Sequence, residues 1–497
     1  MHRDPTSSGP RPEERGTELP TDFHWGVSTS AYQIEGAHDA DGRGPSIWDT
    51  FAGQPGAIER GEDGRHACDH YHRWQDDVRL MRELGLSSYR FSVAWPRIQP
   101  TGRGAANAAG LAFYDRLVDG LCEAGIRPFG TLYHWDLPQA LEDRGGWPHR
   151  DTADRFADYA ALVVGALGDR VKDWSLFNEP FIFTSRGYLF GRYAPGRRSL
   201  PAFLSAVHVV TMAHALGFRA AKGARSDVRV GSTFALAPCE PATNTPDDRW
   251  AASYADALFN HLFLQPLLNG QYPRAFLESI PAAALHARSG DDALMRTPLD
   301  FIGVNCYYRL VVSAGGHNRP DLPYFLFDIR SDTRSAGGHA DFSTAPGQVA
   351  PIESAFGRSE GNRTAMGWEV WPKALYDVLM ELTRLYGRIP LEVCESGCAF
   401  DETPDPDGRI RDQARIAYHQ SHVESVRRAH REGADVRSYH VWSLYDNFEW
   451  ASGYRPRFGL VHVDFATQQR TWKDSAYWFQ RLCRAARSLS PNQQAAS

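Results

Sequence analysis

The chain has 497 residues, long enough for several average domains, and its 42% hydrophobic content, with 12% aromatic residues, is typical of a globular protein with a large core. A formal net charge of −6, with acidic and basic residues interspersed, excludes the basic footprint of a nucleic-acid-binding protein. Seven cysteines, an odd number in a long chain, exclude the disulfide framework of a small secreted domain.

The two ends of the chain differ from its middle. Residues 1–18 are polar and rich in Pro, Gly and Ser, and residues 486–497 have a similar character, which predicts two disordered tails around one folded domain at 19–485. The N-terminal stretch lacks the apolar core of a secretory signal, and no apolar run of membrane-span length is evident. We therefore expect a cytoplasmic protein with no membrane or nucleic-acid partner; the sequence specifies no oligomeric state.

Eight short stretches rich in β-branched and aromatic residues predict strands. In chain order they begin at Phe23, Ser88, Arg127, Val171, Val228, Leu299, Ile389 and Val436. Segments of helical periodicity lie between them, such as LAFYDRLVDGLCEAG and ALYDVLMELTRLYG, which both end in the glycine common at helix C-termini. This alternation predicts an α/β fold, a single (β/α)8 barrel, and the long stretch from Val312 to Arg363 predicts an elaborated loop over its active face.

Polar side chains interleaved with tryptophan follow the predicted strands at their C-terminal ends, where (β/α)8 barrels carry their active sites. They include Gln33, Glu35, Arg90, Trp95, His134, Trp135, Asp136, Asn178, Glu179, Asn305, Tyr307, Glu395, Trp442, Glu449 and Trp450. Amide, carboxylate and imidazole groups suit sugar hydroxyls, and an indole suits the apolar face of a pyranose ring. The pattern predicts a sugar-binding site at this end of the barrel.

Two of these carboxylates, Glu179 and Glu395, end the fourth and seventh strands, which are nearly opposite in a closed ring. A single glutamate at a strand end more often points into water. Opposed carboxylates, however, are the apparatus of glycoside hydrolysis: one protonates the leaving oxygen, and the other attacks the anomeric carbon or activates water. Asn178, beside Glu179, suits the 2-hydroxyl of the sugar.

Long stretches of the chain resemble glycoside hydrolase family 1, the β-glucosidase family, from about Leu19 to Arg484. They are FHWGVSTSAYQIEGA, DHYHRWQDDVRLMRELGLSSYRFSVAWPRI, TLYHWDLPQAL, LFNEP and WSLYDNFEWASGYRPRFGLVHVD. The resemblance implies a retaining β-glycosidase, chiefly a β-glucosidase with tolerance of β-galactosides or β-fucosides. We expect it to use no cofactor and no metal. The resemblance also implies that Glu179 is the acid/base and that Glu395, in CESG, is the nucleophile.

The same resemblance assigns further residues. Arg90 and Tyr307 fall on positions that contact the nucleophile, where a guanidinium keeps a carboxylate ionised and a phenol hydrogen-bonds it. Sugar-binding positions fall on Gln33, His134, Asn178, Asn305, Trp442, Glu449 and Trp450. Trp442 is then the platform under the ring, and Glu449 binds the hydroxyls at C4 and C6. A carboxylate at that position disfavours 6-phosphosugars by repulsion at short range.

The chain departs from the family pattern beside the nucleophile. Cys394 and Ser396 replace a Thr and an Asn, and Cys306 replaces the first Tyr of an Asn-Tyr-Tyr motif. These departures and the long loop leave open a transglycosylase or a specialised glycosidase acting on a natural-product glycoside. A non-catalytic carbohydrate-binding protein is the second alternative, and the presence of both glutamates, Arg90 and Tyr307 argues against it. His66, His70 and His72 lack the partners of a metal site, so none is predicted there.

Overall fold

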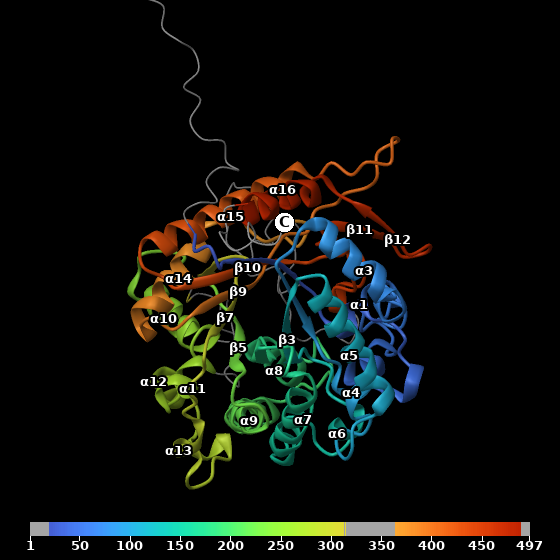
Figure 1. The fold of residues 1–497 in the computed structure, drawn as a ribbon. Helices are drawn as coiled ribbons and strands as arrows, with labels where there is room; N and C mark the ends of the chain where they lie inside the picture. The colour runs from blue at the N-terminus through green and yellow to red at the C-terminus, as the bar shows by residue number, and fades with distance from the viewer. Residues whose placement is uncertain (1–18, 313, 315–362, 489–497) are drawn as a thin grey trace, which may run out of the picture.

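The computed structural model describes residues 19–312, 314 and 363–488, and its centre is a closed barrel of eight parallel strands (Figure 1). The strands are β1 (His24–Ser28), β2 (Ser88–Ser92), β3 (Arg127–Tyr133), β4 (Asp173–Asn178), β5 (Arg229–Ala235), β7 (Ile302–Asn305), β9 (Leu391–Ser396) and β10 (Val436–Trp442). They are neighbours in chain order, and β10 pairs with β1 to close the ring. All eight predicted strands and the (β/α)8 barrel are confirmed.

Two small sheets lie outside the barrel: β6 (Cys239–Pro241) pairs with β8 (Leu310–Val312), and β11 (Val461–Asp464) pairs with β12 (Gln469–Trp472). The helices of the described part are α1 (Ala31–Ile34), α2 (Ile47–Ala52), α3 (His70–Leu84), α4 (Trp95–Ile98), α5 (Ala108–Glu123), α6 (Gln139–Glu142), α7 (Asp151–Leu167), α8 (Pro180–Thr184), α9 (Leu200–Ala224), α10 (Pro246–Phe259), α11 (Leu264–Asn269), α12 (Arg274–Ser279), α13 (Asp291–Met295), α14 (Lys373–Tyr386), α15 (Gln413–Arg431) and α16 (Asp474–Ser488).

Strand β9 has an irregularity that changes which way its side chains point. Cys394 packs with Phe129 and Phe301, which belong to opposite parts of the barrel and therefore meet in its interior. Glu395, the next residue, also points inward, onto Arg90 of β2. Side chains alternate in a regular strand, so two consecutive inward side chains need the register shifts that β9 shows against both β7 and β10. A bulge of this kind re-aims a side chain beside an active site.

Helix α9 corrects one expectation. It has 25 residues and is long and apolar enough, by length and composition, to cross a membrane, although no such run was expected. In the described fold 72% of its apolar window is buried, and the helix packs against α7 and against β4 and β5 (Figure 1). An apolar helix that the barrel covers in this way serves as part of the core.

The boundaries of the folded domain differ slightly from those expected. Helix α16 continues to Ser488, three residues into the range predicted as the C-terminal tail, because its apolar face still packs on the barrel helix α3. Residues 1–18 and 489–497, which hold the predicted tails, lie outside the described residues. So does most of the predicted loop between Val312 and Arg363.

Candidate active site

A cavity opens where the barrel strands end. Of the eleven residues that the family resemblance assigns, its wall contains all but Arg90 and Gln33, namely His134, Asn178, Glu179, Asn305, Tyr307, Glu395, Trp442, Glu449 and Trp450. These residues come from β3, β4, β7, β9 and β10 and from the loops that follow them. The closed barrel thus brings together side chains that are more than 300 positions apart in the sequence.

Both oxygens of the Glu395 carboxylate have fixed partners. Arg90 donates from Nη1 to Oε1 over 2.6 Å, and the Tyr307 hydroxyl donates to Oε2 over 2.8 Å. The side chains of Arg90 and Glu395 are 0% and 4% exposed, so bulk solvent screens the ion pair only weakly. A carboxylate held in this way is oriented and kept negative, as a nucleophile must be.

A chain of hydrogen bonds connects Glu395 to Glu179. Arg90 also donates from Nη2 to Asn178 Oδ1 over 2.8 Å, and Asn305 Nδ2 donates to the same oxygen over 3.0 Å. Asn305 Nδ2 lies 2.8 Å from Glu179 Oε1 and its amide also stabilises the charged form of Glu395. The two carboxyl groups are therefore close neighbours of one amide.

The surroundings of the two carboxyls separate their proton affinities. Burial, followed by the negative charge of Glu395, raises the pKa of Glu179 to about 8. Burial also raises the pKa of Glu395, but the Arg90 cation and the Tyr307 hydroxyl oppose that rise. Of the two carboxyls, Glu395 is the one with a guanidinium bonded to it. We therefore expect Glu179 to carry the proton near neutral pH and Glu395 to be a carboxylate. This is the division of roles between an acid and a nucleophile.

Three residues around the cavity adopt a left-handed backbone. Glu179 has φ 50° and ψ 64° and directly precedes α8, while Trp135 has φ 80° and Trp450 has φ 50°. Such conformations cost energy for residues other than glycine and persist where the surrounding structure holds them, often at active sites. The Glu179 amide donates to Thr233 O over 2.8 Å, and Trp135 Nε1 donates to Asn178 O over 2.8 Å.

His134 is held neutral against Asn178. Because Asn178 Oδ1 accepts from Arg90 and Asn305, its Nδ2 faces His134 and donates to Nε2 over 3.1 Å. Burial and the nearby Arg90 cation keep the pKa of His134 well below its usual value. A second cation next to Arg90 is thereby avoided, so the guanidinium charge remains available to Glu395.

The family model described as "Glycosyl hydrolase family 1" matches residues 15–487 of the chain. The chain belongs to glycosyl hydrolase family 1. It is 39% identical over 466 residues to Beta-glucosidase A of Thermotoga maritima, which covers 94% of this chain and 97% of the relative. It is 44% identical over 474 residues to Thermostable beta-glucosidase B of Thermobispora bispora, with 94% and 90% covered.

A third family 1 relative is the Bifunctional beta-D-glucosidase/beta-D-fucosidase of Bifidobacterium breve, 40% identical over 478 residues, with 93% and 98% covered. Among solved structures, the family 1 b-glucosidase from Thermotoga maritima matches with a TM-score of 0.85 at 38% identity and covers 94% of this chain and 98% of its own. The same relative in complex with deoxynojirimycin matches with a TM-score of 0.83 at 38% identity and covers 94% and 99%. The resemblance stated from the sequence motifs is confirmed.

One wall of the family 1 cavity is aromatic. Trp442 ends β10, and the ring centroids of Trp442 and Trp450 each lie 5.9 Å from that of His134. Glu449 lies beside Trp450 in the loop after β10. Gln33 does not line the cavity: its Nε2 donates to Asn447 Oδ1 over 3.1 Å and to Phe448 O over 2.8 Å, which holds this loop. Direct contact of Gln33 with a sugar stays a prediction.

The lining of the cavity also contains residues that sequence reasoning missed: Ile182, Arg186, Tyr193, Phe259, Tyr308, Met366 and Trp368. Arg186 lies in a single π-helical turn, Ser185–Leu189, that follows α8, and its guanidinium covers the Tyr193 ring at 4.8 Å. Its charge lowers the pKa of Glu179, against the larger effect of burial. In the sequence, the feature of Arg186 that could have indicated a place in the cavity is its position seven residues after Glu179.

Other candidate residues have structural partners. Glu35 is bonded to Arg97 over 3.0 Å and to the Tyr114 hydroxyl over 2.5 Å, outside the cavity wall. His70 does have an acidic partner, since its Nδ1 lies 2.7 Å from Asp77 Oδ2. Within the described ranges the group with metal-ligand spacing is Asp256, His261 and Glu381, and none of these three lines the cavity.

Proposed function

We propose that this family 1 protein is a retaining β-glucosidase that removes terminal, non-reducing β-D-glucosyl residues by double displacement. The observation that carries the proposal is the contrast between two neighbouring carboxyls. Glu395 is bonded to Arg90 and Tyr307, and Glu179, without a bonded cation in the described part of the chain, has a pKa raised to about 8. Retaining glycosidases require a charged carboxylate and a protonated one in one site.

In the first step a Glu395 oxygen attacks the anomeric carbon of the glucoside. The bond between that carbon and the glycosidic oxygen breaks, and the oxygen takes the proton of Glu179, so the aglycone leaves as an alcohol. A glucosyl ester of Glu395 remains, and Glu179 is now a carboxylate. Because the ester of Glu395 carries no charge, the negative charge that raised the pKa of Glu179 is gone, and that pKa falls.

In the second step Glu179 acts as the base. Water gives a proton to its carboxylate while the water oxygen attacks the anomeric carbon, and the ester bond to Glu395 breaks. Glucose leaves with its β-configuration, because two inversions at one carbon restore the starting geometry. Arg90 then compensates the regenerated Glu395 charge at 2.6 Å.

The rest of the cavity supports glucose as the sugar. Trp442 supplies an apolar face, Glu449 a carboxylate for hydroxyls at C4 and C6, and His134 and Asn178 polar atoms for the adjacent hydroxyls. Two of the relatives are named β-glucosidases, and a third is named a bifunctional β-D-glucosidase/β-D-fucosidase. We therefore extend the proposal to tolerance of β-fucosides.

The test is hydrolysis of an aryl β-glucoside with the anomer of the released glucose followed by NMR. The proposal expects β-glucose first, and α-glucose as the first product would overturn retention. Glu395→Ala should abolish turnover, and azide should restore release of the aryl group with an α-glucosyl azide product. Glu424→Ala, at a half-exposed position on α15, serves as the matched control and should keep full activity.

The same experiment addresses the alternatives. Turnover of any aryl β-glucoside excludes a non-catalytic carbohydrate-binding protein. Addition of an acceptor alcohol separates hydrolysis from transfer: a transglycosylase would make more new glucoside than glucose at millimolar acceptor.

A further inference from the structure

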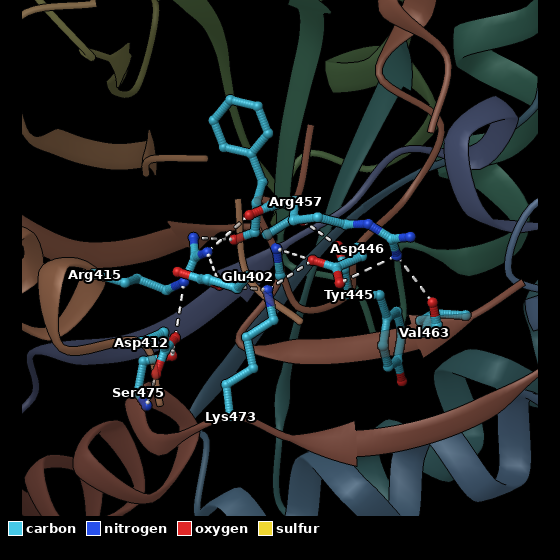
Figure 2. Close-up of polar contacts among 12 residues, drawn as sticks. Glu402, Asp412, Arg415, Tyr445, Asp446, Arg457, Val463, Lys473 and Ser475 are labelled. Atoms are coloured by element: carbon cyan, nitrogen blue, oxygen red, sulfur yellow. Dashed lines mark hydrogen bonds and ion pairs between the residues drawn. The ribbon is translucent and has the colours of Figure 1, made fainter. Parts of the chain in front are cut away.

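A largely buried cluster of six charged residues (Figure 2) is bonded to the backbone of Phe458, a residue that lines the cavity. Three are cations and three are anions, so the cluster is neutral as a whole: Lys473, Arg415, Arg457, Asp446, Glu402 and Asp412. The side chains of Lys473, Arg415, Asp446 and Asp412 are all 0% exposed. None of the six lines the cavity, and the proposed mechanism uses none of them.

Lys473 lies at the centre of this charge cluster. It is the residue between β12 and α16, and of the four lysines in the chain it alone is fully buried. Its Nζ donates to Asp446 Oδ1 over 2.9 Å and to Glu402 Oε2 over 3.0 Å (Figure 2). One ammonium group therefore joins two carboxylates that come from different loops at the mouth of the barrel.

The first of these loops is the one that follows β10 and carries Glu449. Asp446 lies between Trp442 and Glu449, and its Oδ1 also accepts from the Gly459 amide over 2.9 Å. The Asp446 amide donates to Val461 O over 3.0 Å. The side chain and the backbone amide of Asp446 are thus both fixed, and its neighbour Asn447 accepts the hydrogen bond from Gln33. The position of Asp446 sets the path of the chain toward Glu449.

The second loop follows the nucleophile. Glu402 accepts from Arg415 over 2.7 Å, and Arg415 donates to the carbonyl of Cys398, three residues after Glu395. Arg415 also donates to Arg457 O over 2.7 Å and to Phe458 O over 3.0 Å. Phe458 lines the cavity and packs against Tyr307, with ring centroids 6.4 Å apart. The loop after Glu395 is therefore tied to the same cluster.

We propose that Lys473 is a positioning residue, whose ammonium holds the Trp442–Trp450 loop in register with the nucleophile loop and so sets how Glu449 meets the C6 hydroxyl of the sugar. This inference rests on the proposed β-glucosidase function. Buried ion clusters contribute little to net stability compared with apolar residues of the same size, but loss of one partner leaves an uncompensated charge. A site residue must be held to within about 0.5 Å, which a two-carboxylate bridge provides.

The main test compares Lys473→Met with wild type on two substrates. An aryl β-glucoside has the C6 hydroxymethyl group, and the corresponding aryl β-xyloside lacks it. If Lys473 positions Glu449, the ratio of kcat/KM for glucoside over xyloside should fall about tenfold or more in the variant, the value of one hydrogen bond to a charged group. A purely structural role would lower both activities together, and an unchanged ratio overturns the proposal.

The chain offers a matched control and two further variants. Lys373→Met removes a 57% exposed lysine paired with Asp377 and should leave the ratio unchanged. Glu402→Gln keeps the side-chain shape but removes the charge that ties Lys473 to the nucleophile loop, so its ratio should fall in the same direction as that of Lys473→Met. Asp446→Asn, which keeps the side-chain shape, should lower the ratio as Lys473→Met does. A wild-type ratio in both Glu402→Gln and Asp446→Asn would overturn the proposed bridge between the two loops.

Thermal unfolding followed by circular dichroism checks that each variant is folded. If Lys473→Met does not fold, Asp446→Asn takes its place in the test. Its glucoside-over-xyloside ratio of kcat/KM should likewise fall about tenfold, and an unchanged ratio would overturn the proposal. Binding of glucose and xylose, followed by tryptophan fluorescence, needs no turnover. Wild-type protein that hydrolyses no aryl β-glycoside contradicts the proposed function. The positioning role is then judged separately, since it requires glucose affinity to fall more than xylose affinity in Lys473→Met.

Discussion

Arg90 Nη1 lies 2.6 Å from Glu395 Oε1, and the two side chains are 0% and 4% exposed. Charges in such a place are compensated by each other rather than by water. The pair comes from β2 and β9, which are not neighbours in the barrel, so it crosses the interior. The guanidinium also reaches Asn178, so one side chain orients the nucleophile and a residue of the acid/base strand.

Arg90→Met should remove both contacts and leave Glu395 as an uncompensated buried carboxylate. Protonation of that carboxyl would then relieve the penalty, at the cost of its nucleophilicity. We expect kcat/KM on an aryl β-glucoside to fall by about 10²–10³-fold, the usual effect of losing one preorganised charge contact. Steady-state kinetics measures the loss. Arg437→Met, at a 40% exposed position, is the control, and equal activities of the two variants would contradict the assignment.

Glu179→Ala should have an effect that depends on the leaving group. Dinitrophenolate leaves without a proton, so ester formation on Glu395 should persist with that substrate, whereas an alkyl β-glucoside should not react. A burst of dinitrophenolate in stopped-flow kinetics, followed by slow turnover, is the expected record. Equal impairment of both substrates would show that Glu179 is not the acid.

Arg186→Met should shift the pH profile. Glu179 must be protonated for the first step, so kcat/KM is high below its pKa of about 8 and falls as pH rises through that value. Arg186 lowers the pKa of Glu179, so loss of the cation raises that pKa and moves the basic limb to higher pH. Arg186→Lys keeps the charge and should leave the limb near its wild-type position. A limb that moves to lower pH in Arg186→Met contradicts the electrostatic account.

Gly397→Ala should disrupt the site through the backbone. A Cβ at Gly397 would lie 1.8 Å from Trp442 O, so either the turn after Glu395 or the end of β10 must move. We expect a loss of about 100-fold in kcat/KM, as small displacements of reacting groups produce. Gly223→Ala is the matched control: nothing lies within 4 Å of its Cβ in helix α9, and alanine there should stabilise the protein by about 0.5–1 kcal/mol. Wild-type activity of Gly397→Ala would refute the close contact.

Ser396→Asn tests the departure from the family pattern beside the nucleophile. Ser396 is fully buried and points to the Tyr418 hydroxyl at 3.4 Å, longer than an ordinary hydrogen bond between oxygens. A longer amide should hold this end of β9 more firmly. We expect kcat on aryl β-glucosides to rise about threefold to tenfold, or about 0.7–1.4 kcal/mol of barrier. An unchanged kcat, with damage confined to transfer or to another aglycone, would instead indicate that serine makes room for an acceptor.

Local sequence patterns were sufficient for the strands, their alternation with helices and the polar residues at their ends. The reason is that periodicity and turn residues act within a few positions, and a closed ring of eight strands then places their carboxyl ends together. Glu179, Glu395, Asn305 and Tyr307 could be assigned to one cavity on that basis. The bulge at Cys394–Glu395 could not, because it depends on the pairing of β9 with both neighbours.

Tertiary structure alone decided the contacts between distant segments. Lys473 meets Glu402 and Asp446 across 71 and 27 positions, and Arg186, in the π-helical turn after α8, lines the cavity. Helix α9 has the composition of a membrane span, yet the fold buries 72% of its apolar window. Such features depend on which surfaces meet once the strands have formed the closed barrel. Composition and spacing indicate which secondary structure a segment favours. The free energy of burying that segment against a particular partner determines where it lies in the fold.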